Sequence, residues 1–358
     1  MRKFFLLCTV LLLFTSRGAT QNECRTKVPA KPLLIDQNLL EQNNKTLAGP
    51  ITVKVFIHRI AFDPPTEYFV AGEESDILDN FEYARQFWAP QGICLILQGM
   101  DTIQNYDLVS MNDESTTEIA MLENYLVPDA LNIFIHFSFE EEGVLGTAYR
   151  IPNNYISLHE NYTWGGFRML MAHELGHCFG LYHTFETAYG QERVVRTGNC
   201  TNCTTVGDLL CDTEADVKEV TSSLLQNCVY TGTLKDSCNT TYKLTPKNLM
   251  SYHYSETCLD HFTAQQGERA RYFLSNDPVL TPLVLTADNL VRTTNATISN
   301  GARIFYTYRN SISIEAANYT VQQGGQLQMA SKEVTVKPGA TFTPGPTGEV
   351  AIRGFKCQ

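Results

Sequence analysis

Residues 171–183 read Met-Ala-His-Glu-Leu-Gly-His-Cys-Phe-Gly-Leu-Tyr-His, and this stretch decides the fold of the 358-residue chain. His173 and His177 are four residues apart, so a helix places their imidazoles one turn apart on the same face. Glu174 is turned by about 100° from His173 on that helix. Its carboxylate is therefore expected beside the point where the two imidazoles meet, without being a ligand there.

Gly180 allows this helix to end, because glycine adopts a positive φ at no steric cost, and His183 follows three residues later. The stretch thus predicts three neutral imidazole ligands and one open position. Catalytic zinc sites have such a ligand set, whereas structural zinc has four protein ligands, mostly thiolates. The alternative is a helix that buries its histidines without a metal, and it would place two imidazoles and a carboxylate in an apolar turn at high cost.

The pattern HExxHxxGxxH resembles that of the metzincin zinc proteases, which place a methionine turn below the metal. Residues 248–252, Asn-Leu-Met-Ser-Tyr, resemble that turn. Further motifs narrow the resemblance to the pappalysin-like (cytophagalysin) metzincins. They are His183-Thr184-Phe185-Glu186, the run from Gly207 to Thr213, and Cys258, Phe262-Thr263, Gln266 and Arg269 to Arg271. The resemblance covers about residues 50 to 275, and the motifs stand in the family's order.

This resemblance implies a mixed α/β (α+β) fold, with a twisted sheet, a backing helix and the zinc-binding helix. It also implies a zinc-dependent endopeptidase of protein or peptide substrates, in which Glu174 moves a proton from the attacking water to the departing amine. Met250 would form an apolar floor. Tyr252 would either donate a hydrogen bond to the tetrahedral oxyanion or make a structural hydrogen bond only. Glu256 is a candidate for the pocket that binds the residue after the cut.

Residues 184–247 show little periodicity, so this long insert needs disulfides or a cation to be ordered. In the related proteases the Gly-Asp to Asp-Thr segment binds calcium. The resemblance maps such a calcium site onto Asp208, the Cys211 carbonyl and Thr213, and hard oxygen ligands suit that ion. An Asx-type turn without a metal is the alternative.

The cysteine count indicates disulfides. Eleven cysteines become ten once Cys8 leaves with the expected signal peptide, and an even count in an exported chain favours bridges over a metal cluster. Cys178 could be a buried thiol or a bridge. Cys200-Thr201-Asn202-Cys203 also looks like half of a zinc knuckle, but no matching pair follows. The resemblance implies that a cysteine just before Gly207-Asp208, taken here as Cys203, pairs with Cys238, and that Cys228 pairs with Cys258.

Composition and the N-terminus predict a secreted protein. Residues 1–19 have a basic start, an eleven-residue apolar run and small residues for cleavage, which together are typical of a signal peptide. No later apolar stretch reaches 18 residues, so we expect a released, extracellular monomer without a membrane span. Losing Arg2, Lys3 and Arg17 lowers the formal charge from −11 to −14, which makes nucleic acid an unfavourable partner.

Four segments are expected. After the signal peptide, residues 20–50 form a lead-in or short propeptide, 51–282 the protease domain, and 283–358 a small all-β domain. Cys24 could hold zinc as a thiolate in a latent form or serve as a disulfide partner. In the last segment, residues 312–329 and 334–352 look like loose copies of about twenty residues, as in a small β-stack. An adhesin whose function lies in that segment is the rival to the protease.

Alternating or helically spaced apolar residues predict the main elements. Strands are expected over 51–58, 92–97 and 130–137, and helices over 73–88 and 263–274, with loop and short helix over 100–127. Residues 143–149 precede the zinc helix where metzincins place the edge strand that pairs antiparallel with a peptide substrate.

Overall fold

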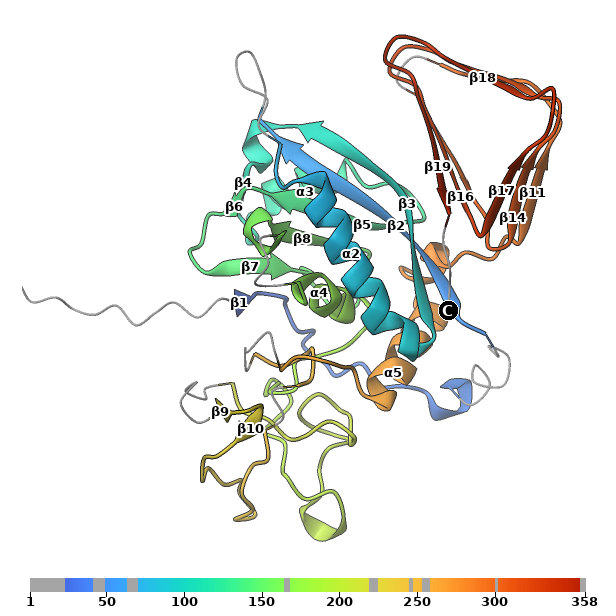
Figure 1. The fold of residues 1–358 in the computed structure, drawn as a ribbon. Coiled ribbons are helices and arrows are strands. Elements are labelled where there is room, and N and C mark those ends of the chain that lie inside the picture. Colours follow the sequence, from blue (N-terminus) through green and yellow to red (C-terminus); the bar gives the residue numbers. More distant parts are fainter. Residues whose placement is uncertain are drawn as a thin grey trace, which may run out of the picture.

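The computed structural model describes residues 23–40, 49–62, 70–163, 168–218, 225–244, 247–252, 258–299 and 302–354. The expected signal peptide and Glu256 lie outside these residues. The described chain combines a mixed α/β part, built on a twisted sheet, with a C-terminal all-β part (Figure 1). The predicted fold class is therefore confirmed. No described helix has the length and apolar character needed to cross a bilayer.

A six-stranded sheet forms the centre of the α/β part, in the order β1-β7-β8-β5-β2-β3. Strands β2, β3, β5 and β8 are parallel, β7 is antiparallel to β8, and the N-terminal β1 adds to β7 in parallel. The bounds are β1 (Glu23–Cys24), β2 (Ile51–Ala61), β3 (Ile93–Gln104), β5 (Leu131–His136), β7 (Val144–Thr147) and β8 (Tyr155–His159). β7 contacts α4 (Leu170–Cys178), the helix of the HExxH motif, and its Gly146 lies against Glu174.

Two differences from the predicted strands have physical reasons. Strand β3 continues to Gln104, where a loop was predicted from Met100, because it pairs with β2 from Ile93 to the end of both strands. Strand β8 was not predicted at all. It has only five residues and is buried between β5 and β7, so buried Ser157 stands among its apolar residues and no regular alternation distinguishes it as a strand.

Helices cover the sheet and enclose the main core (Figure 1). The predicted backing helix is α2 (Glu74–Trp88), which buries Ile77, Phe81, Ala84 and Trp88 and packs on α4 (Leu170–Cys178), the helix of the zinc motif. Helix α5 (Ala264–Asn276) closes this core and begins with a capping box from Thr263 and Gln266.

Shorter elements complete this part. They are α3 (Thr116–Glu123), β4 (Ser110–Met111), β6 (Ser138–Phe139), β9 (Leu225–Gln226) and β10 (Val229–Tyr230), with 3-10 turns at Ala89–Gln91, Tyr106–Leu108, Glu160–Thr163, Gly198–Cys200 and Thr281–Leu283.

Three disulfides tie the insert that follows α4, and one predicted pairing is wrong. The predicted Cys228–Cys258 bridge is present. Cys203, however, pairs with Cys211, and Cys238 pairs with Cys200 instead. Cys203 and Cys211 are only eight positions apart in the sequence, and the turn between them brings their Cα atoms to 5.2 Å. The zinc-knuckle alternative is excluded because both of its cysteines are oxidised. Cys24 and Cys178 are buried free thiols.

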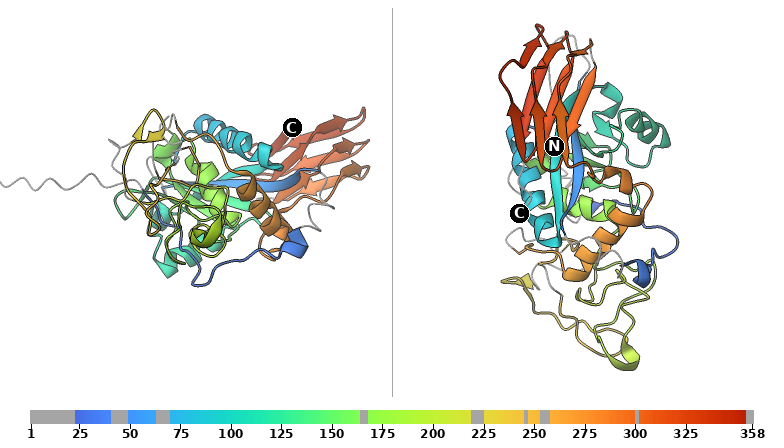
Figure 2. Two further views of the ribbon diagram at one scale, coloured as in Figure 1. Left: turned by 90° about the horizontal axis from the view of Figure 1, so that it is seen from below. Right: turned by 90° about the vertical axis from the view of Figure 1, so that its right-hand side faces the viewer.

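The C-terminal part is a triangular β-solenoid of parallel strands (Figures 1 and 2). Three coils stack in register, with residues 289, 311 and 333 directly above one another. Three coils are present where two copies were predicted, because the first coil keeps the register with a weaker sequence pattern. Its strands are β11 (Asn289–Arg292), β12 (Ala296–Ile298) and β13 (Arg303–Thr307).

The second coil contains β14 (Ser311–Ile314), β15 (Asn318–Val321) and β16 (Gln326–Ser331), and the third contains β17 (Glu333–Val336), β18 (Thr341–Pro344) and β19 (Glu349–Gly354). Inward-facing apolar side chains of the middle coil fill the solenoid. The β13–β16 face of the solenoid packs on β3, where Arg303 pairs with Asp101, and Phe305 meets Phe56 of the neighbouring β2 edge to face at 5.4 Å.

A buried histidine in the sheet gives the fold a pH dependence. His136 bonds through Nδ1 to the Leu108 carbonyl at 2.7 Å and through Nε2 to Ser157 Oγ at 2.8 Å. Burial lowers the pKa of His136 to about 4, so the folded chain holds the ring neutral. Its contribution to stability is present above the unfolded pKa of about 6.5 and is lost as the pH falls towards 4.

We expect the wild type to lose about 2 kcal/mol more stability than His136→Gln between pH 7.5 and pH 5. Urea unfolding of both chains at the two pH values measures this difference. Equal losses would show that His136 does not titrate with the fold.

Candidate active site

The three predicted imidazole ligands converge. His173 and His177 come from α4, which is buried along its whole length, and His183 follows the turn at Gly180. The Nε2 atom of His183 lies 3.2 Å from that of His173 and 3.1 Å from that of His177. The turn requires glycine, because Gly180 has a φ of 89° and a Cβ there would lie 2.3 Å from the Phe273 ring.

Main-chain carbonyls set the tautomers of the two helical histidines. His173 Nδ1 donates to the Leu249 carbonyl at 2.6 Å, and His177 Nδ1 donates to the Leu181 carbonyl at 2.9 Å. Their Nε2 lone pairs therefore point at the common centre. Burial lowers the pKa of His173 to about 4 and takes those of His177 and His183 well below their usual value. All three rings are held neutral, as ligands must be.

This arrangement fits a zinc ion. Zinc–nitrogen distances of about 2.1 Å in a tetrahedral site separate the ligand atoms by roughly 3.4 Å, close to the separations found here. The Nε2 lone pairs of His173 and His177 face His183 Nε2, and a cation at the common centre satisfies the three imidazoles at once.

Glu174 lies beside the three histidines and is fully buried. Its Oε2 accepts a hydrogen bond from Thr26 Oγ1 at 3.2 Å, and its Oε1 has no hydrogen-bond partner among the described residues. Burial raises the pKa of Glu174 to about 8. A carboxyl group in this environment can accept and release a proton near neutral pH.

The predicted methionine turn lies directly below the histidines. Met250 is buried against Gly176 of α4, where a Cβ would lie 2.5 Å from the methionine sulfur. Asn248 Oδ1 accepts from the Met250 amide at 2.9 Å, and the Met250 carbonyl accepts from Thr184. The turn thus supports both ends of the motif, since its Leu249 carbonyl also fixes His173.

Tyr252, two residues after the methionine, reaches the histidines from the side. Its ring centroid lies 4.7 Å from that of His183 and 6.0 Å from that of His173. The hydroxyl accepts from the Cys24 amide at 2.7 Å and donates to the Cys24 carbonyl. The phenol is therefore placed beside the candidate zinc site and is bound by the N-terminal segment.

Cys24 completes the cluster. Its Sγ and one nitrogen of each of the three histidines lie within 4.8 Å of one another. The same sulfur lies 3.3 Å from Glu174 Oε2. Thr26, two residues on, accepts from the Ala148 amide at 2.8 Å and contacts Glu174. Residues 24 to 26 thus contact every group that the sequence assigned to catalysis.

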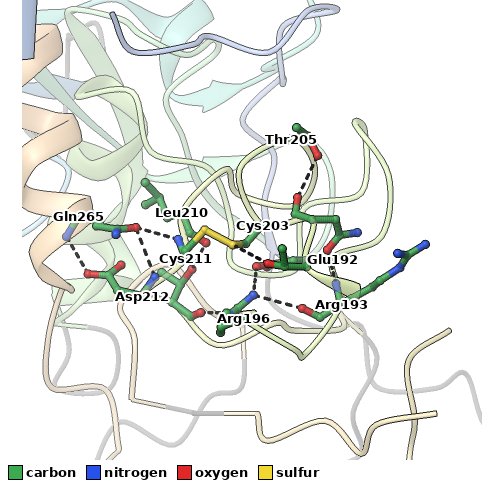
Figure 3. The surroundings of a disulfide bond; sticks show 12 residues. Glu192, Arg193, Arg196, Cys203, Thr205, Leu210, Cys211, Asp212 and Gln265 are labelled. Carbon is green, nitrogen blue, oxygen red and sulfur yellow. Dashed lines mark hydrogen bonds and ion pairs between the residues drawn. A yellow bond between two sulfur atoms is a disulfide. The ribbon is translucent and has the colours of Figure 1, made fainter. Parts of the chain in front are cut away.

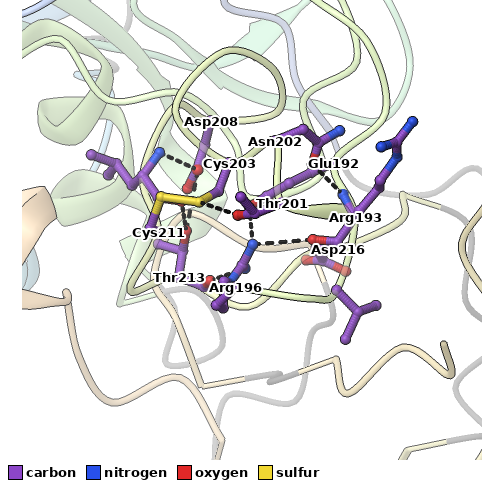
Figure 4. A network of polar contacts seen from close by, with 12 residues as sticks. Glu192, Arg193, Arg196, Thr201, Asn202, Cys203, Asp208, Cys211, Thr213 and Asp216 are labelled. Atoms are coloured by element: carbon purple, nitrogen blue, oxygen red, sulfur yellow. Dashed lines mark hydrogen bonds and ion pairs between the residues drawn. A yellow bond between two sulfur atoms is a disulfide. The ribbon is translucent and has the colours of Figure 1, made fainter. Parts of the chain in front are cut away.

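A second polar cluster lies in the loop that follows α4 (Figures 3 and 4). Asp208 Oδ1 accepts from the Leu210 amide at 3.0 Å and from Thr213 Oγ1 at 3.1 Å. Arg196 pairs with Glu192 and donates to the Thr213 carbonyl. The buried Asp208 Oδ2 and Glu192 Oε2 have no hydrogen-bond partner in the described part of the chain. Burial raises the pKa of both carboxyl groups, and the neighbouring Asp208 charge raises the pKa of Glu192 further.

Comparisons with known proteins find peptidases. Residues 140–275 match the family model described as pregnancy-associated plasma protein-A, a peptidase family. Residues 140–275 belong to the pappalysin-like metzincins. The protein is accordingly a metallopeptidase.

Individual relatives are more distant. The chain is 28% identical over 238 residues to an extracellular metalloprotease of Sordaria macrospora, covering 61% of this chain and 73% of the relative. It is 27% identical over 252 residues to one of Pyricularia oryzae, covering 63% and 77%. A mutant promirolysin structure from Tannerella forsythia gives a TM-score of 0.49 at 13% identity, over 69% of this chain and 88% of that chain.

Some residues at this pappalysin-like site carry no sequence signal of their own. Thr26 and Glu192 are ordinary residue types in segments without periodicity, and only the fold brings them to Glu174 and Asp208. The Cys211 carbonyl and Thr213, predicted as calcium ligands, lie in the loop beside Asp208. The Thr213 carbonyl already accepts a hydrogen bond from the Arg196 guanidinium. Cys24 is a free thiol beside His173, His177 and His183, so the disulfide alternative for it is wrong.

Proposed function

We propose that the protein is a secreted, zinc-dependent endopeptidase that cleaves extracellular proteins or peptides. The observation that carries this proposal is the convergence of three Nε2 atoms beside the buried carboxylate of Glu174. An adhesin would have no need of this arrangement. The relatives are named extracellular metalloproteases, which supports an extracellular place of action.

His173, His177 and His183 would hold the zinc ion. When bound, zinc polarises the scissile carbonyl and lowers the pKa of water towards about 7. Glu174 takes the proton from the attacking water and delivers it to the leaving amine, and its raised pKa suits both transfers. Tyr252 now donates to the Cys24 carbonyl, and in the active enzyme the same hydroxyl donates to the oxyanion of the substrate.

Strand β7 would bind the substrate main chain. On the side away from β8, β7 pairs with β1 through Glu23↔Val144 and Cys24↔Gly146. An antiparallel peptide would use the same edge, so β1 and a substrate exclude each other.

This exclusion supports a latent form. Residues 20–50 act as a propeptide in this proposal, with Cys24 as the fourth ligand in the position that water needs. The protease domain then spans 51–282, and residues 283–358 form a separate C-terminal domain.

We also propose that a calcium ion binds the loop of Asp208. Two orphaned carboxylate oxygens, from Asp208 and Glu192, are hard ligands in a buried place where two like charges repel. This extends the predicted ligand set by Glu192. The alternative is a metal-free turn neutralised by Arg196.

Replacing the general base tests the catalytic proposal. Glu174→Ala should lower casein hydrolysis by about 100- to 10,000-fold and keep one zinc per chain, because Glu174 is not a ligand. His183→Ala should lose both zinc and activity. Glu268→Ala changes an exposed helical glutamate and is the control. Unchanged hydrolysis in Glu174→Ala, measured beside the metal content, would contradict the mechanism.

Removal of the fourth ligand tests latency. Cys24→Ala should hydrolyse peptides while its N-terminal segment is still intact, whereas the uncleaved wild type should not. Mass spectrometry establishes the intact N-terminus, and Cys178→Ala, which changes the other buried free thiol, is the matched control. Full activity of the uncleaved wild-type chain would rule out a latent form.

Calcium at 100 times its dissociation constant should stabilise the wild type by about 2.7 kcal/mol. Glu192→Gln and Asp208→Asn should abolish most of this gain, and Glu214→Gln, an exposed neighbour of Thr213, should keep it. Urea unfolding in calcium and in a chelator measures the gain. No gain in the wild type would leave the metal-free turn as the correct interpretation.

A further inference from the structure

The solenoid stands against β3, at the edge of the protease sheet (Figure 1), and a polar hollow lies at this junction. Successive side chains of a strand point to opposite faces. Val53 and Val55 of β2 enter the core with α2 and α4, so Lys54 points to the other face, into the hollow. The hollow has a volume of about 440 Å³, which is in the range of small-molecule sites. Its walls come from β2, β3, β13, Asp129 and residues 281–287.

Gln98 brings a polar group without a partner to this hollow. Leu97 and Gly99 of β3 pair with consecutive residues of β2, so Gln98 is the extra residue of a β-bulge. Its side chain lines the hollow, is only 8% exposed, and carries an Oε1 atom with no hydrogen-bond partner among the described residues. A buried carbonyl oxygen without a donor is unfavourable. A ligand that supplies a donor would therefore be stabilised here.

Three further polar groups face the same hollow. Thr307 of β13 has a buried hydroxyl, which also lacks a hydrogen-bond partner in the described part of the chain. Burial lowers the pKa of Lys54, and the charge of Asp129 opposes that fall. The ammonium can only donate, the carboxylate can only accept, and the hydroxyl can do both. Because the two charges cancel, the hollow favours a neutral ligand with both donors and acceptors.

Phe305 gives this ligand an apolar surface. Its ring is partly exposed and lines both this hollow and a second one of about 450 Å³. Gln104, Asn124, Tyr125 and Arg303 contribute to the second hollow. The turn before β5 also reaches both, through residues 127–128 on one side and residue 129 on the other. The two hollows therefore adjoin at an aromatic ring, and together they are called the junction groove.

The junction groove is held in shape by the contact between the two parts of the chain. A Cβ at Gly99 would lie 2.4 Å from Gln328 Oε1, so only glycine lets β16 come so close to the sheet. Asp101 pairs with Arg303 of the solenoid and lies 2.7 Å from His58 Nδ1. The walls are thus in place before a ligand arrives, which lowers the entropic cost of binding.

We propose that the junction groove binds a neutral oligosaccharide, with one sugar ring on Phe305 and its hydroxyl groups bonded to Gln98 and Thr307. Each sugar hydroxyl both donates and accepts, so a single ligand meets the needs of the amide oxygen, the ammonium and the carboxylate. The C–H face of a sugar ring suits an aromatic surface. The groove lies on the face of the sheet away from α4, so this binding goes beyond the proposed peptidase function and does not depend on it.

Isothermal titration calorimetry on the intact chain tests the groove. One arm uses the trisaccharides of chitin, cellulose, xylan and mannan, and the other uses high-mannose glycans released from glycoproteins. At least one probe should bind with a dissociation constant in the micromolar to millimolar range, and the arm that contains it distinguishes a polysaccharide from a glycoprotein ligand. Gln98→Leu keeps the side-chain size, removes the acceptor and should weaken binding about five- to tenfold.

Asp129→Asn is the second variant, because Asp129 is exposed and asparagine tolerates its φ of 58°. It should weaken binding about two- to fivefold and decides the test if Gln98→Leu does not fold. Asp79→Asn changes an exposed aspartate of α2, which covers the opposite face, and should bind like the wild type. Absence of binding by every probe up to about 10 mM would overturn the proposal. Wild-type affinity in a folded Gln98→Leu or in Asp129→Asn would also overturn it.

Discussion

The structure depends on three buried imidazoles that must meet at one point. Two come from adjacent turns of α4, and the third needs the chain to reverse at Gly180, against the ring of Phe273. Such a group of neutral acceptors is unfavourable in an apolar core unless a cation compensates it. The methionine turn fixes the geometry, since its carbonyl orients His173 and its sulfur packs on Gly176. The packing of the core, the methionine turn and the three histidines therefore depend on one another.

The N-terminal segment contacts the three histidines and Glu174 from the other side. Its sulfur faces the imidazoles, its main chain binds the Tyr252 hydroxyl, and Thr26 contacts Glu174. The segment also fills the free edge of β7, which would otherwise present unpaired main-chain groups. In the latent form proposed above, residues 23–26 would both inhibit the enzyme and protect this strand edge.

The sequence predicted those features that local spacing determines. The four-residue interval of His173 and His177, the alternation in β2 and the periodicity of α2 each require only neighbours along the chain. It failed for β8, whose burial on both sides removes alternation, and for the partners of Cys203 and Cys238, which depend on how a loop without periodicity folds. Cys24 and Glu192 show the same limit, because each acquires its surroundings from residues more than ten positions away.

The solenoid has a consequence for how such chains change length. Each coil repeats after 22 residues at its first strand and rests on the coil before it with the same pairing. The β13–β16 face contacts the protease sheet, through side chains such as Phe305. Duplication of one whole period during evolution would add a coil and leave that contact in place. An insertion of any other length would shift every later strand out of register with its neighbour. Natural variation in this part should therefore come in whole-coil steps.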